Sequence, residues 1–223
     1  MAKYSPAPFH RRRLIIRIAS QINWHTALDI GCGNAMLLRE MARCFPDKTV
    51  SGADISSEII EKNKTNYPTI RFYKLDINNE TLPYKYDLVI ASEIIEHLHD
   101  TRTGLRNLKE MCNDKLIITV PSGPIFPIDK QMGHFRHFSK DELSQLLEEC
   151  GFTVCFVWRW GFPFHVLYKH VINFFPSFFI RKFAASKYSA ASRIFSKFLI
   201  LLFYTNLKNF PVSNQLIACA SVK

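Results

Sequence analysis

The two ends of this 223-residue chain lack acidic residues altogether. Residues 1–28 and 151–223 contain no Asp or Glu, so all nineteen carboxylates lie between Asp29 and Glu149. The same two ends carry five and nine Lys or Arg residues, and thirteen of the nineteen Phe residues follow residue 150. The C-terminal section is therefore basic and aromatic, and it differs in composition from an acidic middle section.

Disulfide, metal and secretion signals are also missing. The six cysteines include no CxxC pair, which disfavours a disulfide framework or a zinc site and favours reduced thiols. No secretory signal is recognised at the N-terminus, because Arg17 interrupts the short apolar run that follows Arg11, Arg12 and Arg13. A cytoplasmic location is expected.

Short apolar runs of strand length alternate with helical patterns through most of the chain. A first helix is expected over residues 9–22, and the following helices over 35–44, 58–65, 103–112 and 139–150, with Ser57, Thr101 and Ser139 as N-caps. The expected strands cover 26–30, 49–53, 70–75, 88–91, 116–120, 152–158 and 216–222. Such alternation predicts an α/β fold with a parallel sheet that helices cover on both faces.

The chain is expected to form one domain with four sections. Residues 1–23 are a helical N-terminal segment, 24–158 a cofactor-binding core, 159–213 a basic aromatic helical insertion, and 214–223 the final strand. Within the core, a long loop is expected from residue 121 to residue 138, because the run Pro-Ser-Gly-Pro breaks regular structure.

A glycine turn follows the first expected strand. Gly31 and Gly33 lie where that strand meets the first helix of the core, a place where backbone N–H groups favour an anionic ligand. Twenty-one residues after Gly33, Asp54 ends the second strand and can accept hydrogen bonds from both hydroxyls of a ribose. Asp54 could instead cap the next helix. Asp76, at the end of the third strand, could face an adenine amino group.

These segments together resemble the class I S-adenosylmethionine-dependent methyltransferases, particularly the subgroup similar to ubiquinone and menaquinone biosynthesis methyltransferases. The resemblance spans about residues 25–158 and rests on Ala27–Gly33, Gly52–Ser56, Leu75–Ile77, Tyr86–Leu98, Gly133–Phe138, Glu142–Leu143 and Gly151–Phe152. Ala35 departs from the family, which often has a third glycine there.

The resemblance implies a Rossmann-like, doubly wound sheet of seven strands in the order 3-2-1-4-5-7-6, with only strand 7 antiparallel. It also implies that S-adenosylmethionine is the cofactor. The residues expected around its methionine part are Asp29, Gly31, Cys32 and Gly33; around its ribose, Asp54 and Ile55; around its adenine, Asp76 and Ile77; and beside the methyl donor, Ser92 and Glu93.

Histidines in two loops are candidates for work on the methyl acceptor. His134 and His97 follow the fifth and fourth strands, and histidine is suited to act as a general base near neutral pH. Each could equally be a structural residue of its loop. Arg136 and His137 are candidate substrate contacts. His134, His137 and Asp129 could also be metal ligands, but no further ligand pair appears at metal spacing, so no metal is expected.

An amphipathic helix is expected within residues 183–204, where Ala191, Ile194, Phe195, Phe198, Leu201 and Leu202 recur at helical spacing. Charged residues interrupt it too often for it to span a bilayer. It could be a lid over the site, a partner interface, or a contact with an anionic membrane surface. No nucleic-acid recognition module is visible, and the sequence makes no prediction of oligomeric state.

The function that fits best is methyl transfer from S-adenosylmethionine to a small or lipid-linked acceptor, most simply at oxygen, by in-line displacement. Two alternatives remain open. A catalytically silent nucleoside-binding module would act through its basic aromatic tail, and a nicotinamide-dependent oxidoreductase would use the same turn. Met36 disfavours the oxidoreductase because the dinucleotide-binding pattern has glycine there.

Overall fold

A single eight-stranded sheet runs through the computed structural model, which describes residues 5–174 and 190–222. Its order is β3-β2-β1-β4-β5-β8-β6-β7. The strands are β1 (Thr26–Ile30), β2 (Thr49–Asp54), β3 (Arg71–Lys74), β4 (Tyr86–Ser92), β5 (Cys112–Pro121), β6 (Phe152–Phe162), β7 (Leu207–Lys208) and β8 (Gln215–Val222). The α/β fold class is confirmed.

Strand directions agree with the predicted topology, apart from one added strand. The first five strands pair in parallel, and β8 is antiparallel to both β5 and β6. β8 is thus the predicted seventh strand, in its predicted place. The count of seven was too low, because the two residues of β7 add an antiparallel edge strand against β6. So short a strand has too few residues to show a periodic apolar pattern.

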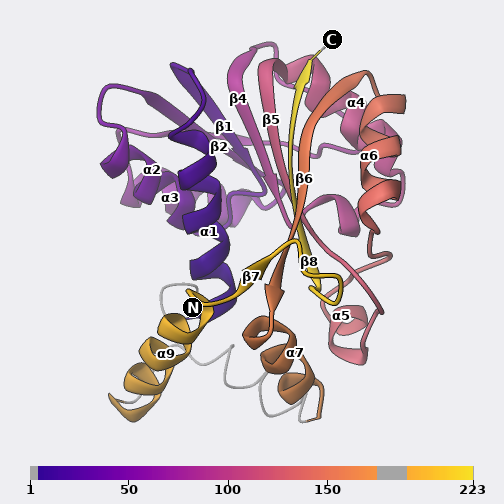
Figure 1. Ribbon diagram of the computed structural model, residues 1–223. Coiled ribbons are helices and arrows are strands. Elements are labelled where there is room, and N and C mark those ends of the chain that lie inside the picture. The colour runs from indigo at the N-terminus through magenta and orange to yellow at the C-terminus, as the bar shows by residue number, and fades with distance from the viewer. Residues whose placement is uncertain (1–4, 175–189, 223) are drawn as a thin grey trace.

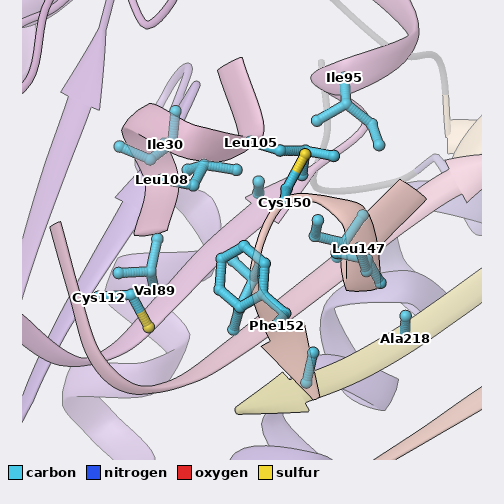
Figure 2. Packing of buried hydrophobic residues seen from close by; sticks show 14 of the residues in the cluster. Ile30, Val89, Ile95, Leu105, Leu108, Cys112, Leu147, Cys150, Phe152 and Ala218 are labelled. Atoms are coloured by element: carbon cyan, nitrogen blue, oxygen red, sulfur yellow. The ribbon is translucent and has the colours of Figure 1, made fainter. Parts of the chain in front are cut away.

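Helices cover both faces of the sheet, as Figure 1 shows. One face packs against α1 (Pro6–Ala19), α2 (Met36–Cys44) and α3 (Ser57–Asn66). The other packs against α4 (Thr101–Met111) and α6 (Lys140–Glu149). On this second face Leu105, Leu108, Leu147 and Phe152 belong to one buried cluster with Val89 of the central strand β4 (Figure 2). Burial on both faces explains why the strands are nearly continuous apolar runs.

Two predicted helix caps are wrong by one residue. Ser56, not Ser57, caps α3, because its backbone is still extended and its Oγ accepts the Ile59 N–H at 3.3 Å. Asp100, not Thr101, caps α4, and its carboxylate accepts two backbone N–H groups. The predicted capping box of Ser139 and Glu142 on α6 is confirmed. In each correction the residue ahead of the predicted cap is itself a strong capping type.

The strand that precedes the predicted insertion 159–213 is longer than predicted, and the insertion contains the short strand β7 as well as helices. β6 continues to Phe162, and a five-residue helix, α5 (Pro127–Gln131), interrupts the loop expected over 121–138. Beyond β6 lie α7 (Phe164–Phe174) and α9 (Ala190–Phe203), while residues 183–189 of the predicted amphipathic helix fall outside the described part of the chain. Within that part, no helix is long and apolar enough to cross a membrane.

The two helices that the structure describes in the insertion, α7 and α9, lie beyond the edge of the sheet where the parallel strands end. Figure 1 marks the C-terminus at the far end of β8, which runs against β5. The carboxyl ends of β1, β2, β4 and β5 therefore lie at the opposite edge, the side on which α5, α7 and α9 extend in Figure 1. Ligands of open α/β sheets bind at this edge.

Candidate active site

The turn after β1 is built from left-handed backbone. Gly31, Gly33 and Ala35 have φ values of +68°, +48° and +54°, the region that glycine enters most easily. A Cβ placed on Gly31 would lie 2.0 Å from Cδ1 of Ile94, so Gly31 makes room for that side chain. A Cβ on Gly33 would meet no protein atom within 4 Å. Gly33 is thus the open part of the turn.

Asp54 is fastened directly to this turn. Its Oδ2 accepts the Gly33 N–H at 3.0 Å and its Oδ1 accepts the Ser56 N–H at 3.0 Å. Asn63 of α3 holds the other side of the turn by donating to the Gly33 carbonyl at 2.6 Å. Because Ser56 caps α3, the alternative role of Asp54 as the helix cap is wrong. Sequence analysis missed Asn63, whose place in a helix gave no sign of this contact.

Asp29 carries a strongly perturbed carboxyl group. It is buried near the end of β1, and burial, together with the charge of nearby Asp54, raises its pKa to about 8. The neighbouring Cys32 is also buried and belongs to the apolar cluster on the α1 face of the sheet. Its side chain points into the core, so its backbone is the part of Cys32 that can face a ligand.

The candidate adenine residues lie in a compact loop after β3. β3 ends at Lys74, so Asp76 follows the strand by two residues and does not end it as predicted. Its carboxylate accepts hydrogen bonds from Asn78 and Asn79, and these bonds lower its pKa. Ile77 is buried, whereas Ile55, beside Asp54, is 62% exposed. An exposed isoleucine next to a polar turn can provide an apolar wall for a ligand.

Glu93 follows β4 in a strained conformation, and two side chains hold its carboxylate. Its φ of +59° is unusual for a residue other than glycine. Its Oε1 accepts the Thr119 hydroxyl at 3.2 Å, and Ser92 lies 2.9 Å from the same hydroxyl. Its Oε2 lies 3.0 Å from Nη1 of Arg11. The N-terminal helix thus reaches the predicted methyl-donor region, a contact that the sequence did not reveal.

Three histidines gather over the carboxyl edge of β4 and β5. The rings of His97 and His134 meet edge to face with centroids 4.7 Å apart, and His134 Nδ1 lies 3.2 Å from His137 Nε2. Burial, and next the charge of His97, lowers the pKa of His134 to about 4, which leaves its ring neutral at physiological pH. The predicted candidates His97, His134 and His137 are therefore brought together.

Two buried carboxylates border the histidines. Glu96 is fully buried, and burial followed by the charge of Glu93 raises its pKa well above the usual value. Asp129 of α5 lies 3.5 Å from His137 and 3.1 Å from Nζ of Lys169 on α7. Sequence analysis named Asp129 but missed Glu96 and Lys169. Glu96 lies three residues after Glu93, within the Tyr86–Leu98 segment that carries the family resemblance. Its acidic side chain was the only sign in the sequence that it could belong to the site.

Arg136 lies outside the histidine cluster. Its side chain is exposed and donates to the His99 carbonyl at 3.3 Å. It lines a surface hollow shared with His137, Phe138 and Glu142. A substrate that occupies this outer hollow would contact Arg136.

Sequence comparison identifies the core of the chain. Residues 28–115 match the family model described as a methyltransferase domain. The chain is 33% identical over 78 residues to malonyl-[acyl-carrier protein] O-methyltransferase of Halalkalibacterium halodurans, a match that covers 32% of this chain and 29% of the relative. It is 30% identical over 99 residues to (S)-coclaurine N-methyltransferase of Thalictrum flavum, covering 42% and 27%. The chain thus spans less than a third of these relatives.

Comparison of the methyltransferase fold with solved structures extends over almost the whole chain. The N-methyltransferase NodS of Bradyrhizobium japonicum, solved with S-adenosylhomocysteine, superposes with a TM-score of 0.61 at 15% identity. The superposition covers 98% of this chain and 88% of that one. The resemblance to class I S-adenosylmethionine-dependent methyltransferases is confirmed. The ubiquinone and menaquinone subgroup stays a prediction.

Proposed function

We propose that this chain binds S-adenosylmethionine and transfers its methyl group to a small or lipid-linked acceptor, at oxygen. The observation that carries the proposal is the junction of Asp54 with the glycine turn, where the Gly33 N–H donates to the carboxylate and no other described residue comes within 4 Å of a Cβ built on Gly33. Among the matched relatives, one is named as an O-methyltransferase and another as an N-methyltransferase.

The residues present fit an adenosine ligand with an amino-acid tail. A carboxylate offers about four lone-pair sites, and Asp54 uses two of them on backbone N–H groups, which leaves two for ribose hydroxyls. Asp29 offers a buried carboxyl beside the turn for the ammonium group of the methionine part. Asp76 and Ile77 would border the adenine, with Ile55 as an apolar wall.

The chemistry asks little more of the protein than positioning. Bound S-adenosylmethionine would supply a methyl group already activated by its sulfonium. Glu93, held by Arg11 and Thr119, would fix the surroundings of that methyl group. His97 and His134 would face the acceptor from the loops beyond β4 and β5. Alignment of the acceptor with the methyl carbon is the main contribution expected of the chain.

Calorimetric titration with S-adenosylhomocysteine and with NAD⁺ tests the cofactor assignment. We expect binding of S-adenosylhomocysteine with one site per chain and no comparable binding of NAD⁺. Stronger binding of NAD⁺ would support an oxidoreductase instead. The protein is incubated with isotope-labelled S-adenosylmethionine and with aqueous or lipid extracts of cells. Formation of a labelled product would distinguish an enzyme from a silent binding module. An absence of labelled product in both extracts would contradict the proposed enzymatic activity.

The raised pKa of Asp29 predicts that cofactor binding depends on pH. Because the free protein holds Asp29 largely protonated below pH 8, a cationic ammonium group must displace that proton on binding. The affinity for S-adenosylhomocysteine should therefore rise as the pH increases from 6 to 8, by up to about tenfold per unit, and then level off. Titrations in buffers of different ionisation heat should also report proton release.

The variant Asp29→Asn provides the control for this pH dependence. It should bind more weakly at pH 8, and its affinity should no longer rise through this range. A wild-type affinity that stays constant between pH 6 and pH 8 would exclude Asp29 from contact with the ammonium group.

We further propose that α7 and α9 rest on an anionic membrane surface. On α9, Ile194, Phe198 and Leu201 are 70%, 55% and 66% exposed, so most of the described part of the predicted apolar stripe faces outward. On α7, Leu167 and Phe174 are 60% and 80% exposed. The absence of acidic residues beyond residue 150 favours an anionic partner. Exposed apolar side chains and basic charge together favour a lipid surface over a purely polar one.

Sedimentation with vesicles tests the membrane proposal. Wild type should pellet with vesicles of phosphatidylglycerol and phosphatidylcholine, less so at high salt, and only weakly with phosphatidylcholine alone. The triple variant Ile194→Ser, Phe198→Ser, Leu201→Ser should lose at least about tenfold in partitioning. Its melting temperature should change little, because all three side chains are exposed.

The substitution Tyr84→Ser is the matched control for that variant. Tyr84 is 55% exposed but lies outside the C-terminal section, so its replacement should leave vesicle binding unchanged. Equal recovery of wild type and triple variant in the pellet would contradict the membrane proposal.

A further inference from the structure

Three possible metal ligands lie close together over the carboxyl edge of β4 and β5. One carboxylate oxygen of Glu96, one ring nitrogen of His97 and one ring nitrogen of His134 lie within 4.8 Å of one another. Glu96 and His97 belong to the short helix η1 (Ile95–His97) after β4, and His134 to the loop after α5. Backbone contact joins the two loops, because the Phe135 N–H donates to the Glu96 carbonyl at 2.9 Å.

The Glu96 carboxylate lacks the partners that a buried acid normally has. Its exposed fraction is 0%, and neither oxygen has a hydrogen-bond partner among the described residues. Burial of a carboxylate is costly unless the group is hydrogen-bonded, paired or bound to a metal. The nearest titratable nitrogen is His97 Nε2, which lies 4.0 Å from Oε1, beyond hydrogen-bond distance. A bound cation would give both oxygens a partner.

The hydrogen bond of His97 shows which of its ring nitrogens carries the proton and which carries the lone pair. His97 Nδ1 lies 3.0 Å from the Gly133 carbonyl, and a carbonyl can only accept, so the ring N–H must be at Nδ1. In the neutral ring Nε2 then carries the lone pair, and this is the nitrogen on the side of Glu96. Metal-binding histidines commonly donate their second nitrogen to a backbone carbonyl in this way.

A second carbonyl sets the orientation of His134 through His137. His137 Nδ1 lies 3.1 Å from the Gly123 carbonyl, so it carries the N–H and leaves a lone pair on Nε2. That lone pair accepts from His134 Nδ1 at 3.2 Å. His134 Nε2 is therefore left with a free lone pair. Two histidines with free lone pairs and the Glu96 carboxyl group then share one space, within 4.8 Å of one another.

We propose that Glu96, His97 Nε2 and His134 Nε2 bind one divalent transition-metal ion. Two imidazoles and one carboxylate form a ligand set typical of zinc and related ions, with a further position open to water or substrate. Ligand atoms of a tetrahedral zinc site lie about 3.4 Å apart, so small side-chain rotations would close the present spacing. His137 is then a positioning residue, held by its hydrogen bond to the Gly123 carbonyl.

The metal site would change the part that the histidines play. A ring nitrogen bound to a metal accepts no proton, so His134 would act as a ligand and not as the general base. In the proposed methyl transfer, the ion would polarise an acceptor oxygen in its open position. This role rests on the proposed function, whereas metal binding itself does not.

Metal binding can be measured without methyl transfer. Chelator-treated protein is dialysed against Zn²⁺ and its metal content determined, with Mg²⁺ as competitor. Wild type should bind one Zn²⁺ per chain that excess Mg²⁺ does not displace. Glu96→Gln and His134→Ala should each weaken Zn²⁺ binding at least about 100-fold, and His137→Ala about 10- to 100-fold. His25→Ala, at an exposed histidine outside the cluster, should bind like wild type.

Thermal unfolding separates metal binding from damage to the fold. Without metal, Glu96→Gln should melt close to the temperature of wild type, because the amide keeps the size and shape of the buried carboxyl group. Saturating Zn²⁺ should raise the melting temperature of wild type and leave that of Glu96→Gln unchanged. Unaltered Zn²⁺ content in Glu96→Gln and His134→Ala, displacement by Mg²⁺, or no Zn²⁺ bound by wild type would each overturn the proposal. Methyl transfer without metal binding would leave the proposed function standing.

Discussion

Replacing Asp54 with alanine is expected to weaken the binding of S-adenosylhomocysteine about 100-fold or more. Two hydrogen bonds from ribose hydroxyls to a carboxylate contribute roughly 1.5–3 kcal/mol each, and a loss of about 2.7 kcal/mol already corresponds to a factor of 100. The substitution also removes the acceptor that holds the Gly33 and Ser56 N–H groups. Isothermal titration calorimetry measures the affinity directly.

A second variant separates recognition of the ribose from support of the turn. Asp54→Asn keeps one oxygen, so one of the two backbone N–H groups retains its acceptor while the charge is lost. Its affinity should fall between those of wild type and Asp54→Ala. Asp47→Ala, at an exposed position outside the site, should bind like wild type. Comparable affinity in wild type and Asp54→Ala would remove Asp54 from the ribose role.

The second large effect is expected at Gly33. Gly33→Ala should lower the affinity for S-adenosylhomocysteine about 10- to 100-fold while the protein stays folded. The added Cβ meets no protein atom within 4 Å, so the protein itself bears only the left-handed backbone cost of about 1–2 kcal/mol. The same Cβ would occupy space needed by a closely approaching ligand, where overpacking costs about 1–3 kcal/mol. Calorimetry and thermal unfolding, measured together, separate the two costs.

Gly123→Ala is the matched control for this comparison. Gly123 also has a positive φ, +79°, and open space around its built Cβ, but it lies in the loop after β5. The two variants should lose similar stability, and only Gly33→Ala should lose cofactor affinity. Equal cofactor affinity in both variants would place the ligand away from the turn. Gly31→Ala is a different case, because a Cβ there collides with Ile94.

The pairing of Asp54 with the glycine turn was predictable from the sequence. Parallel strands end at one edge of a sheet, so residues that follow β1 and end β2 must lie close together. The strand order followed from the family resemblance, and continuous apolar runs located most of the strands. The local sequence pattern and the sheet topology together were enough to predict that Asp54 lies beside the glycine turn.

The part of the site around Glu93, Glu96 and the three histidines was less predictable, because its contacts join segments that are distant in the sequence. Arg11 reaches Glu93 only because α1 packs across the edge of the sheet. The Phe135 N–H donates to the Glu96 carbonyl across 39 residues of sequence and so brings Glu96 close to His134. The cluster therefore has no metal-like spacing in the sequence. The stripe of Ile194, Phe198 and Leu201 was found by its period, yet the period could not reveal that these side chains face outward.

A crystal structure of the protein with S-adenosylhomocysteine tests the cofactor site most directly. The nucleoside should lie above Gly33, with both ribose hydroxyls within hydrogen-bond distance of the Asp54 carboxylate and the ammonium group near Asp29. A nucleoside bound elsewhere, or no nucleoside in crystals soaked at saturating concentration, would contradict the proposed cofactor site and the methyl transfer that depends on it.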